Sequence, residues 1–208
     1  MRVSLIGQAA FGEAVFKRLM EDGIEIVGVS APASEQRPDP LWTAAEEAGL
    51  TPIDTKFLKE AEGIEQWQTL NSELGVMAFV TELLPDEILT TPDKGTIQYH
   101  PSLLPLHRGS SAMNWPIIFG EKETGLTVFW PDKGMDTGPI LLQKTCPIKP
   151  DETLGSLYFD QLFPMGIDAM SEAVSLVENG TAQSVEQDHN HSTYEPPCGE
   201  SHARIQWY

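Results

Sequence analysis

The sequence predicts an α/β protein built on a mostly parallel β-sheet with helices packed against it. Short, mostly apolar runs at 3–6, 24–29 and 75–80 are typical of strands buried on both faces. Amphipathic stretches separate these runs, and such alternation is typical of βαβ units. The chain of 208 residues has the size of one large domain and can bury a substantial core.

The N-terminal half contains the clearest of these units. Gly7 closes the first strand, and apolar residues at near-helical spacing then predict a helix that stops around Asp22-Gly23, before the strand 24–29. Three prolines mark 31–40 as a loop. Further helices are expected over 41–48 and 64–74, and further strands over 75–80 and 95–99.

The longest helical pattern lies in the C-terminal half, over 153–178. It should bend near Pro164 and stop at Asn179-Gly180. A shorter helix, capped by Ser110 or Ser111, should run to about residue 119. The β-rich segments of this half are 126–130 and 140–148.

After Gly180 the composition becomes polar. Residues 181–208 contain prolines and few aliphatic side chains, so we expect a catalytic domain over 1–180 followed by an extended tail or the start of a linker to a C-terminal domain. The apolar end, 205–208, predicts that this tail packs on something or that the chain continues.

Composition and charge exclude several classes of protein. With 13 Lys and Arg against 31 Asp and Glu the net charge is −18, which argues against a nucleic-acid partner because phosphate binding draws on cations. No apolar run approaches the ~20 residues of a membrane span. Cys146 and Cys198 give neither a disulfide framework nor a metal-ligand spacing. We therefore expect a cytoplasmic protein without membrane contact.

Three loops at predicted strand ends are candidates for the functional site. In open parallel sheets, ligands bind outside the carboxyl ends of the strands. The loops 82–85, 100–109 and 132–138 all follow such ends, and we expect them to converge.

His100 and Asp136 are the side chains in these loops best suited to chemistry. A histidine directly after a buried strand can act as a general acid or base, although it can also merely bond a loop carbonyl. Asp136 lies in a Gly-flanked loop that can bring a carboxylate to a ligand or to His100, although such an aspartate often bonds its own turn.

Other motifs give weaker indications. The segment 7–12 resembles a glycine turn entering a helix, where amides can hold an anion, but it lacks the G-x-G-x-x-G spacing of dinucleotide sites. His189 and His191 lie in the polar tail without a third ligand, so we expect a solvated loop there, not a metal site. Cys146 is expected in the core, without a basic neighbour to activate it.

The segment His100-Pro101-Ser102-Leu103-Leu104-Pro105 completes a larger pattern. Together with Arg108-Gly109, Ala112, Asn114-Trp115 and Asp136-Thr137-Gly138, it resembles the formyltransferase family that uses 10-formyltetrahydrofolate. His100 and Asp136 are 36 positions apart, as the catalytic pair of that family requires. The resemblance spans about residues 1–180 and touches the tail at Thr193-Tyr194-Glu195.

Within that family the chain resembles in particular the hydrolase domains of 10-formyltetrahydrofolate dehydrogenases. The likeness is carried by Gly7-Gln8 with Phe11-Gly12, by 99–105, by Phe129-Trp130 and by Leu162-Phe163-Pro164. Methionyl-tRNA, glycinamide ribonucleotide and sugar-nucleotide formyltransferases share the central motif.

The resemblance implies a Rossmann-like fold with helices on both sheet faces and no metal. It implies a folate cleft between 82–85 and 132–138, in which Glu82, Leu83, Leu84 and Asp136 bind the 10-formyltetrahydrofolate donor. His100 and Asp136 would be catalytic. Most members have asparagine two residues before the histidine, whereas this chain has Gln98, which keeps the amide donor on a longer arm.

Several functions remain open at this point. The formyl group can pass to water, to an amine, to a sugar nucleotide or to methionyl-tRNA, and the charge of −18 disfavours the last. The chain can also be a folate-binding module of a larger enzyme, without chemistry of its own. An NAD-binding domain ranks last because the glycine fingerprint is missing.

Overall fold

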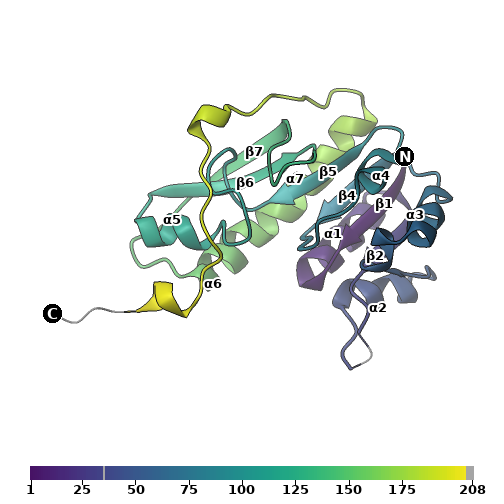
Figure 1. Ribbon diagram of the computed structural model, residues 1–208, viewed down its shortest axis with the longest axis horizontal. Coiled ribbons are helices and arrows are strands. Elements are labelled where there is room, and N and C mark those ends of the chain that lie inside the picture. The colour runs from purple at the N-terminus through teal and green to yellow at the C-terminus, as the bar shows by residue number, and fades with distance from the viewer. Residues whose placement is uncertain (35, 205–208) are drawn as a thin grey trace.

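A seven-stranded sheet of order β3-β2-β1-β4-β5-β6-β7 forms the centre of the computed structural model, which describes residues 1–34 and 36–204 (Figure 1). The strands β1 to β5 pair in parallel, while β6 pairs antiparallel with both β5 and β7. The mostly parallel sheet is confirmed. Its strands are β1 (Arg2–Gly7), β2 (Glu25–Ala31), β3 (Ile53–Asp54), β4 (Leu74–Ala78), β5 (Thr96–His100), β6 (Glu123–Phe129) and β7 (Ile140–Pro147).

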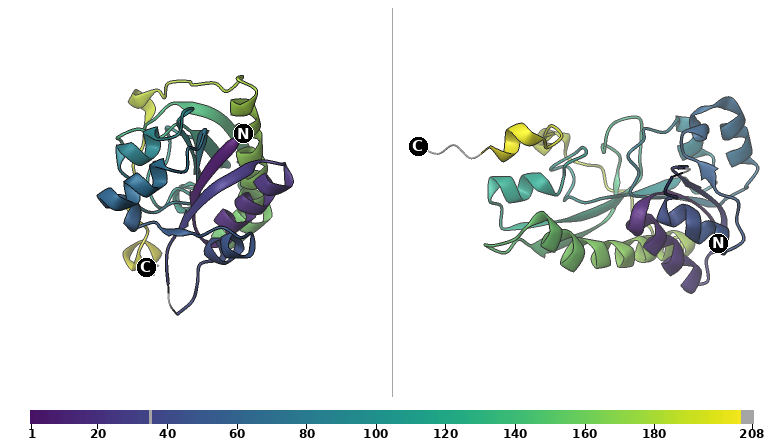
Figure 2. Two further views of the ribbon diagram at one scale, coloured as in Figure 1. Left: turned by 90° about the vertical axis from the view of Figure 1, so that its right-hand side faces the viewer. Right: turned by 90° about the horizontal axis from the view of Figure 1, so that it is seen from below.

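Helices cover both faces of the sheet (Figure 2). Adjacent strand residues point to opposite faces, so Leu5 packs in the core beneath α1 and α7, whereas Ile6 packs with Trp67 of α3. The helices are α1 (Ala9–Glu21), α2 (Pro40–Glu47), α3 (Ala61–Gln68), α4 (Asp86–Thr90), α5 (Asn114–Phe119), α6 (Leu154–Ser156) and α7 (Phe163–Glu178). No helix in the described residues is long and apolar enough to cross a bilayer.

Two predicted elements end earlier than the apolar pattern indicates. The helix expected over 64–74 stops at Gln68, and Asn71 then takes a positive φ of 49° as the chain turns into β4. The strand expected over 75–80 stops at Ala78, because Phe79 has a φ of 61° and leaves the extended conformation. Both elements are followed by a non-glycine residue in the left-handed conformation, and the sequence gives no local signal that predicts this conformation.

The helix expected from Ser110 or Ser111 begins only at Asn114. Neither serine caps it: the N-cap position is Met113, without a side-chain cap. The Ser111 hydroxyl instead accepts a hydrogen bond from the main-chain N–H of Cys198, 2.9 Å away in the tail. Ser111 therefore does not cap the helix because its hydroxyl is used in a contact with a residue far away in the sequence.

The long C-terminal helical segment is interrupted where the proline predicts a bend. Residues Leu157–Leu162 form a π-helical stretch between α6 and α7, and Pro164 lies in the first turn of α7, where its missing N–H is tolerated. The helix ends as expected, with Gly180 at a φ of 69°.

The tail leaves α7 and runs back along the β7 edge of the sheet, and two short 3₁₀ helices, His189–His191 and Glu200–Ala203, interrupt its extended segments (Figure 1). Val185 forms an antiparallel bridge with Ile140 of β7, and Tyr194 forms a parallel bridge with Arg108. The described part of the tail packs on the body of the protein through polar contacts such as those of Gln187, Tyr194 and Cys198. The apolar end 205–208 lies outside the described residues.

Candidate active site

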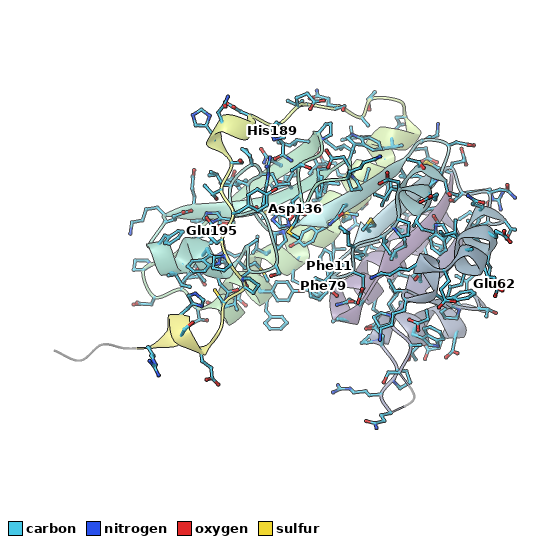
Figure 3. All side chains as sticks on the ribbon, viewed as in Figure 1. Phe11, Glu62, Phe79, Asp136, His189 and Glu195 are labelled. Carbon is cyan, nitrogen blue, oxygen red and sulfur yellow. The ribbon has the colours of Figure 1, made fainter. Side chains whose placement is uncertain are left out.

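A cavity of about 500 Å³ opens at the carboxyl ends of β4 and β5. The loops 79–86, 98–113 and 129–136 line it, so the three loops expected to converge do so. Figure 3 shows Phe79 and Asp136 near this region. All six predicted site residues line the cavity: Gln98, His100, Asp136, Glu82, Leu83 and Leu84.

His100 is the last residue of β5 and is 5% exposed. Its Nε2 lies 2.9 Å from the carbonyl oxygen of His107. Because a carbonyl only accepts, Nε2 carries a hydrogen and donates it. The other ring nitrogen, Nδ1, lies 3.7 Å from Oδ2 of Asp136. The histidine thus bonds a loop carbonyl through one nitrogen and faces a carboxylate with the other.

Asp136 is held by residues from outside its own turn. Its Oδ2 accepts a hydrogen bond of 2.8 Å from the main-chain N–H of Gly109, and its backbone has a φ of 56°. The turn is instead organised by Asp132, whose Oδ1 accepts from the N–H of Gly134 and from the hydroxyl of Thr137. Asp132, not Asp136, is therefore the aspartate that stabilises the turn by accepting hydrogen bonds within it. The Asp136 carboxylate faces His100.

Gln98 lies in the middle of β5, in register with Met77 of β4 and Phe129 of β6. Its side chain lines the cavity two residues before His100. Within residues 1–34 and 36–204 its amide makes no side-chain hydrogen bond, so the N–H groups are available to a ligand.

The loop 82–85 forms the wall opposite Asp136. Leu84 is 8% exposed and packs with the core cluster around Trp67, whereas Leu83 is 73% exposed. The Glu82 carboxylate accepts a hydrogen bond from the Lys59 ammonium, which holds the pKa of Glu82 below its ordinary value. The two leucines thus differ: Leu84 is built into the wall, and Leu83 projects at its rim.

The glycine turn at 7–12 serves packing. A Cβ on Gly7 would lie 2.6 Å from the carbonyl oxygen of Ala78, so the turn must be glycine for β1 to approach β4. The N–H of Ala9, at the start of α1, already donates to Oδ2 of Asp39 at 2.8 Å. The protein's own carboxylate therefore occupies the position where an anion would bind.

These observations can be set beside known proteins. Residues 1–174 match the family described as Formyl transferase. The chain belongs to this family. It is 43% identical over 216 residues to the mitochondrial 10-formyltetrahydrofolate dehydrogenase of Mus musculus, covering 100% of this chain and 23% of that protein. It is 34% identical over 215 residues to the methionyl-tRNA formyltransferase of Caldanaerobacter subterraneus, covering 100% of this chain and 69% of the relative.

Solved structures share the fold of this formyl transferase family member. Glycinamide ribonucleotide transformylase 1 from Symbiobacterium toebii matches with a TM-score of 0.77 at 20% identity, covering 89% of this chain and 94% of the other. HypX from Aquifex aeolicus, solved in complex with tetrahydrofolic acid, matches with a TM-score of 0.76 at 19% identity, covering 100% and 31%. The Rossmann-like formyltransferase fold is therefore confirmed.

Contacts between the tail and the loop 100–109 were not predicted from the sequence. Arg108, 3% exposed, donates to Gln187 Oε1 and to Nδ1 of His189. His107 bonds Glu121 and Glu195 through its two ring nitrogens (Figure 3 labels Glu195 and His189). His189 and His191 are both exposed, as expected, but Nδ1 of His189 also accepts a hydrogen bond from the buried Arg108, and His191 pairs with Asp188.

Only the resemblance at Thr193-Tyr194-Glu195 pointed toward the tail, and nothing in the sequence singled out Gln187. The described residues contain no group of three His, Cys, Asp or Glu side chains able to hold a metal ion. A smaller hollow of about 250 Å³ beside His107 and 121–124 lies apart from His100 and Asp136.

Proposed function

We propose that this chain removes the formyl group from 10-formyltetrahydrofolate and passes it to water or to an amine. The observation that carries the proposal is the approach of His100 Nδ1 to within 3.7 Å of Asp136 Oδ2 beside the 500 Å³ cavity. These residues are 36 positions apart, and both side chains are nearly buried. The 10-formyltetrahydrofolate dehydrogenase relative supports a formyl-folate donor.

The chemistry begins at an amide-like carbonyl. Attack on the formyl carbon places negative charge on its oxygen, and each preorganised donor aimed at that oxygen contributes about 3 kcal/mol to the transition state. Gln98 presents an unbonded amide to the cavity next to His100, which suits it to such a donor role.

His100 supplies the proton exchange. The bond from Nε2 to the His107 carbonyl fixes the ring and leaves Nδ1 as the atom that takes up or donates a proton. The Asp136 carboxylate stabilises the positive charge of the doubly protonated ring by Coulomb attraction and orients an attacking or relaying water.

The folate ring system is assigned to the slot between 82–85 and 132–136. Apolar groups such as Leu84 and Phe129 would bury the ring, and the main-chain groups of 82–84 would orient it. A calorimetric titration tests this assignment. Leu84→Asp should abolish folate binding, while Ile118→Asp, on the exposed face of α5 away from the cavity, should leave binding unchanged.

The acceptor is distinguished by one assay. Formation of tetrahydrofolate with no acceptor added supports a hydrolase, and turnover only with an added amine or sugar nucleotide supports a transferase. The proposed localisation is cytoplasmic, with the catalytic domain over 1–180 followed by a tail or linker. A further C-terminal domain accords with the length of the dehydrogenase relatives, of which this chain spans 23%.

The second candidate is a folate-binding module without chemistry of its own. The observation that favours it is Gln98, whose longer arm displaces the amide relative to the asparagine found in most members. Folate binding without turnover, with water and with every acceptor tried, would establish the module and overturn the enzyme.

A further inference from the structure

Residues 185–195 cross both loops that carry the candidate catalytic pair, and we refer to them as the strap. Thr193 exchanges main-chain hydrogen bonds with the segment 105–108, and Tyr194 donates its hydroxyl to the carbonyl of Met135. The same strap therefore contacts the His100 loop and the Asp136 loop. Figure 1 shows this segment running along the upper border of the sheet, beyond β7, and then turning down in front of it.

Gln187 is the buried centre of the strap, with 4% exposure. Its Oε1 accepts from Nη2 of Arg108 at 2.6 Å and from Nε at 3.3 Å. Its Nε2 donates to the carbonyl oxygens of Asp136, at 2.9 Å, and Gly138, at 2.7 Å. Because guanidinium only donates and carbonyls only accept, the orientation of this amide is fixed by its partners.

Arg108 depends on that amide. Its side chain is buried, and within the described residues it forms no ion pair with a carboxylate; its acceptors are Gln187, His189 Nδ1 and the Tyr194 hydroxyl. A buried cation needs its donors satisfied, so Arg108 holds Gln187 in place. The guanidinium thereby connects the His100 loop to the Asp136 loop through one glutamine.

Asp136 needs to be held. A non-glycine residue at a φ of 56° costs of the order of 1 kcal/mol, so the loop gains by relaxing if released. It is fixed at two points, since Gly109 binds its carboxylate and Gln187 binds its carbonyl. Removal of the second point would let Oδ2 move away from Nδ1 of His100.

We propose that Gln187 is a positioning residue of the active site, which sets the distance between Asp136 and His100 from the strap. This inference rests on the proposed function for its kinetic test. Gln187 touches neither the cavity nor His100, so its effect passes through Asp136. A misplacement of about 1 Å at such a pair can cost about 10²-fold in rate.

Three variants test the role in kinetics. Gln187→Met removes both donors and the acceptor, and Gln187→Glu keeps an acceptor for Arg108 but removes the donors to both carbonyls. Both should lower kcat at least about tenfold, with KM for 10-formyltetrahydrofolate within about threefold. Gln183→Met, at an exposed strap-proximal glutamine, is the matched control and should retain wild-type kcat.

The Glu variant separates positioning from stability. Its carboxylate pairs with Arg108 but has no proton to donate to the carbonyl oxygens of Asp136 and Gly138, so kcat should fall by more than any loss of folded protein explains. Wild-type kcat in Gln187→Glu overturns the proposal. So does a loss of kcat in either Gln187 variant that merely parallels the loss of folded protein.

A readout without turnover keeps the two proposals distinct. The ring ¹⁵N signals of His100, assigned by their absence in His100→Gln, should differ from wild type in both Gln187 variants and not in Gln183→Met. If the wild-type chain turns over no acceptor, the proposed function fails while this shift still supports positioning by Gln187. Unchanged His100 signals in both Gln187 variants overturn the inference.

Discussion

The Nε2 atom of His100 and the carbonyl oxygen of His107 lie 2.9 Å apart, and this one bond decides which ring nitrogen is left for chemistry. His107 itself has a φ of 54°, an uncommon conformation that turns its carbonyl toward the ring. Two residues later, Gly109 donates to the Asp136 carboxylate. The segment 107–109 therefore orients both members of the candidate pair.

The first prediction concerns that pair. His100→Ala and Asp136→Ala should each lower the rate of formyl removal by about 10² or more, because one removes the proton donor and the other removes its charge partner. In His100→Ala the folate affinity, measured by calorimetry, should change little, whereas Asp136→Ala should also weaken binding because Asp136 is a predicted folate ligand. His191→Ala, on the exposed surface, is the control. Full activity in both variants would refute the assignment.

A second prediction concerns Gln98. If its amide stabilises the developing oxyanion, Gln98→Ala should lower kcat by about 10-fold to 10³-fold with little change in KM. Gln98→Asn restores an amide on a shorter arm and should keep more activity than Gln98→Ala. Equal kcat in wild type and Gln98→Ala would remove Gln98 from the mechanism.

The third prediction concerns the close contact of β1 with β4. Gly7→Ala places a methyl group 2.6 Å from the Ala78 carbonyl oxygen, and the backbone there cannot yield as a flexible side chain would. We expect a loss of about 1–3 kcal/mol in the free energy of unfolding, measured in urea. Gly155→Ala is the control because its nearest neighbour, Thr153 Oγ1, lies 3.9 Å away. Equal destabilisation by both changes would contradict the packing argument.

A fourth prediction concerns the two thiols. Burial raises the pKa of the Cys146 thiol, so less thiolate forms at a given pH, and its alkylation should be slow at pH 8 and accelerate as the pH rises. Cys198 is partly exposed and should react first. Mass spectrometry after timed alkylation distinguishes them, and urea should equalise their rates. Faster labelling of Cys146 in the folded protein would be the contrary result.

The sheet could be predicted because its buried parallel strands have mostly apolar sequences. The runs around Leu5 and Val76 lie in the strands they predict. Pro164 lies in the first turn of α7, where no N–H is needed, and Gly180 takes a positive φ just after the helix ends. The ends of helices and strands were predicted less accurately. The turns at Asn71 and Phe79 use positive φ values at residues that can also adopt ordinary ones, so local sequence does not mark them.

The position of the cavity could be predicted from the sequence because the loops that line it follow the ends of predicted strands. His100 and Asp136 stand at positions where topology brings loops together, and the structure brings them to 3.7 Å. The role of Gln187 could not be predicted from the sequence. Its side chain is buried because Arg108, 79 positions earlier, needs an acceptor, and a polar tail gives no local sign of such a partner. The contact of Ser111 could not be predicted for the same reason, because its partner, Cys198, is far away in the sequence.

The strap has a consequence for the order in which the protein matures on the ribosome. Every strand of the sheet is synthesised before Val185 is added. The loop of Asp136 gains its second anchor only when Gln187 emerges and meets Arg108. A chain truncated after Gly180 would thus lack Gln187, and the Asp136 loop would keep only its anchor at Gly109.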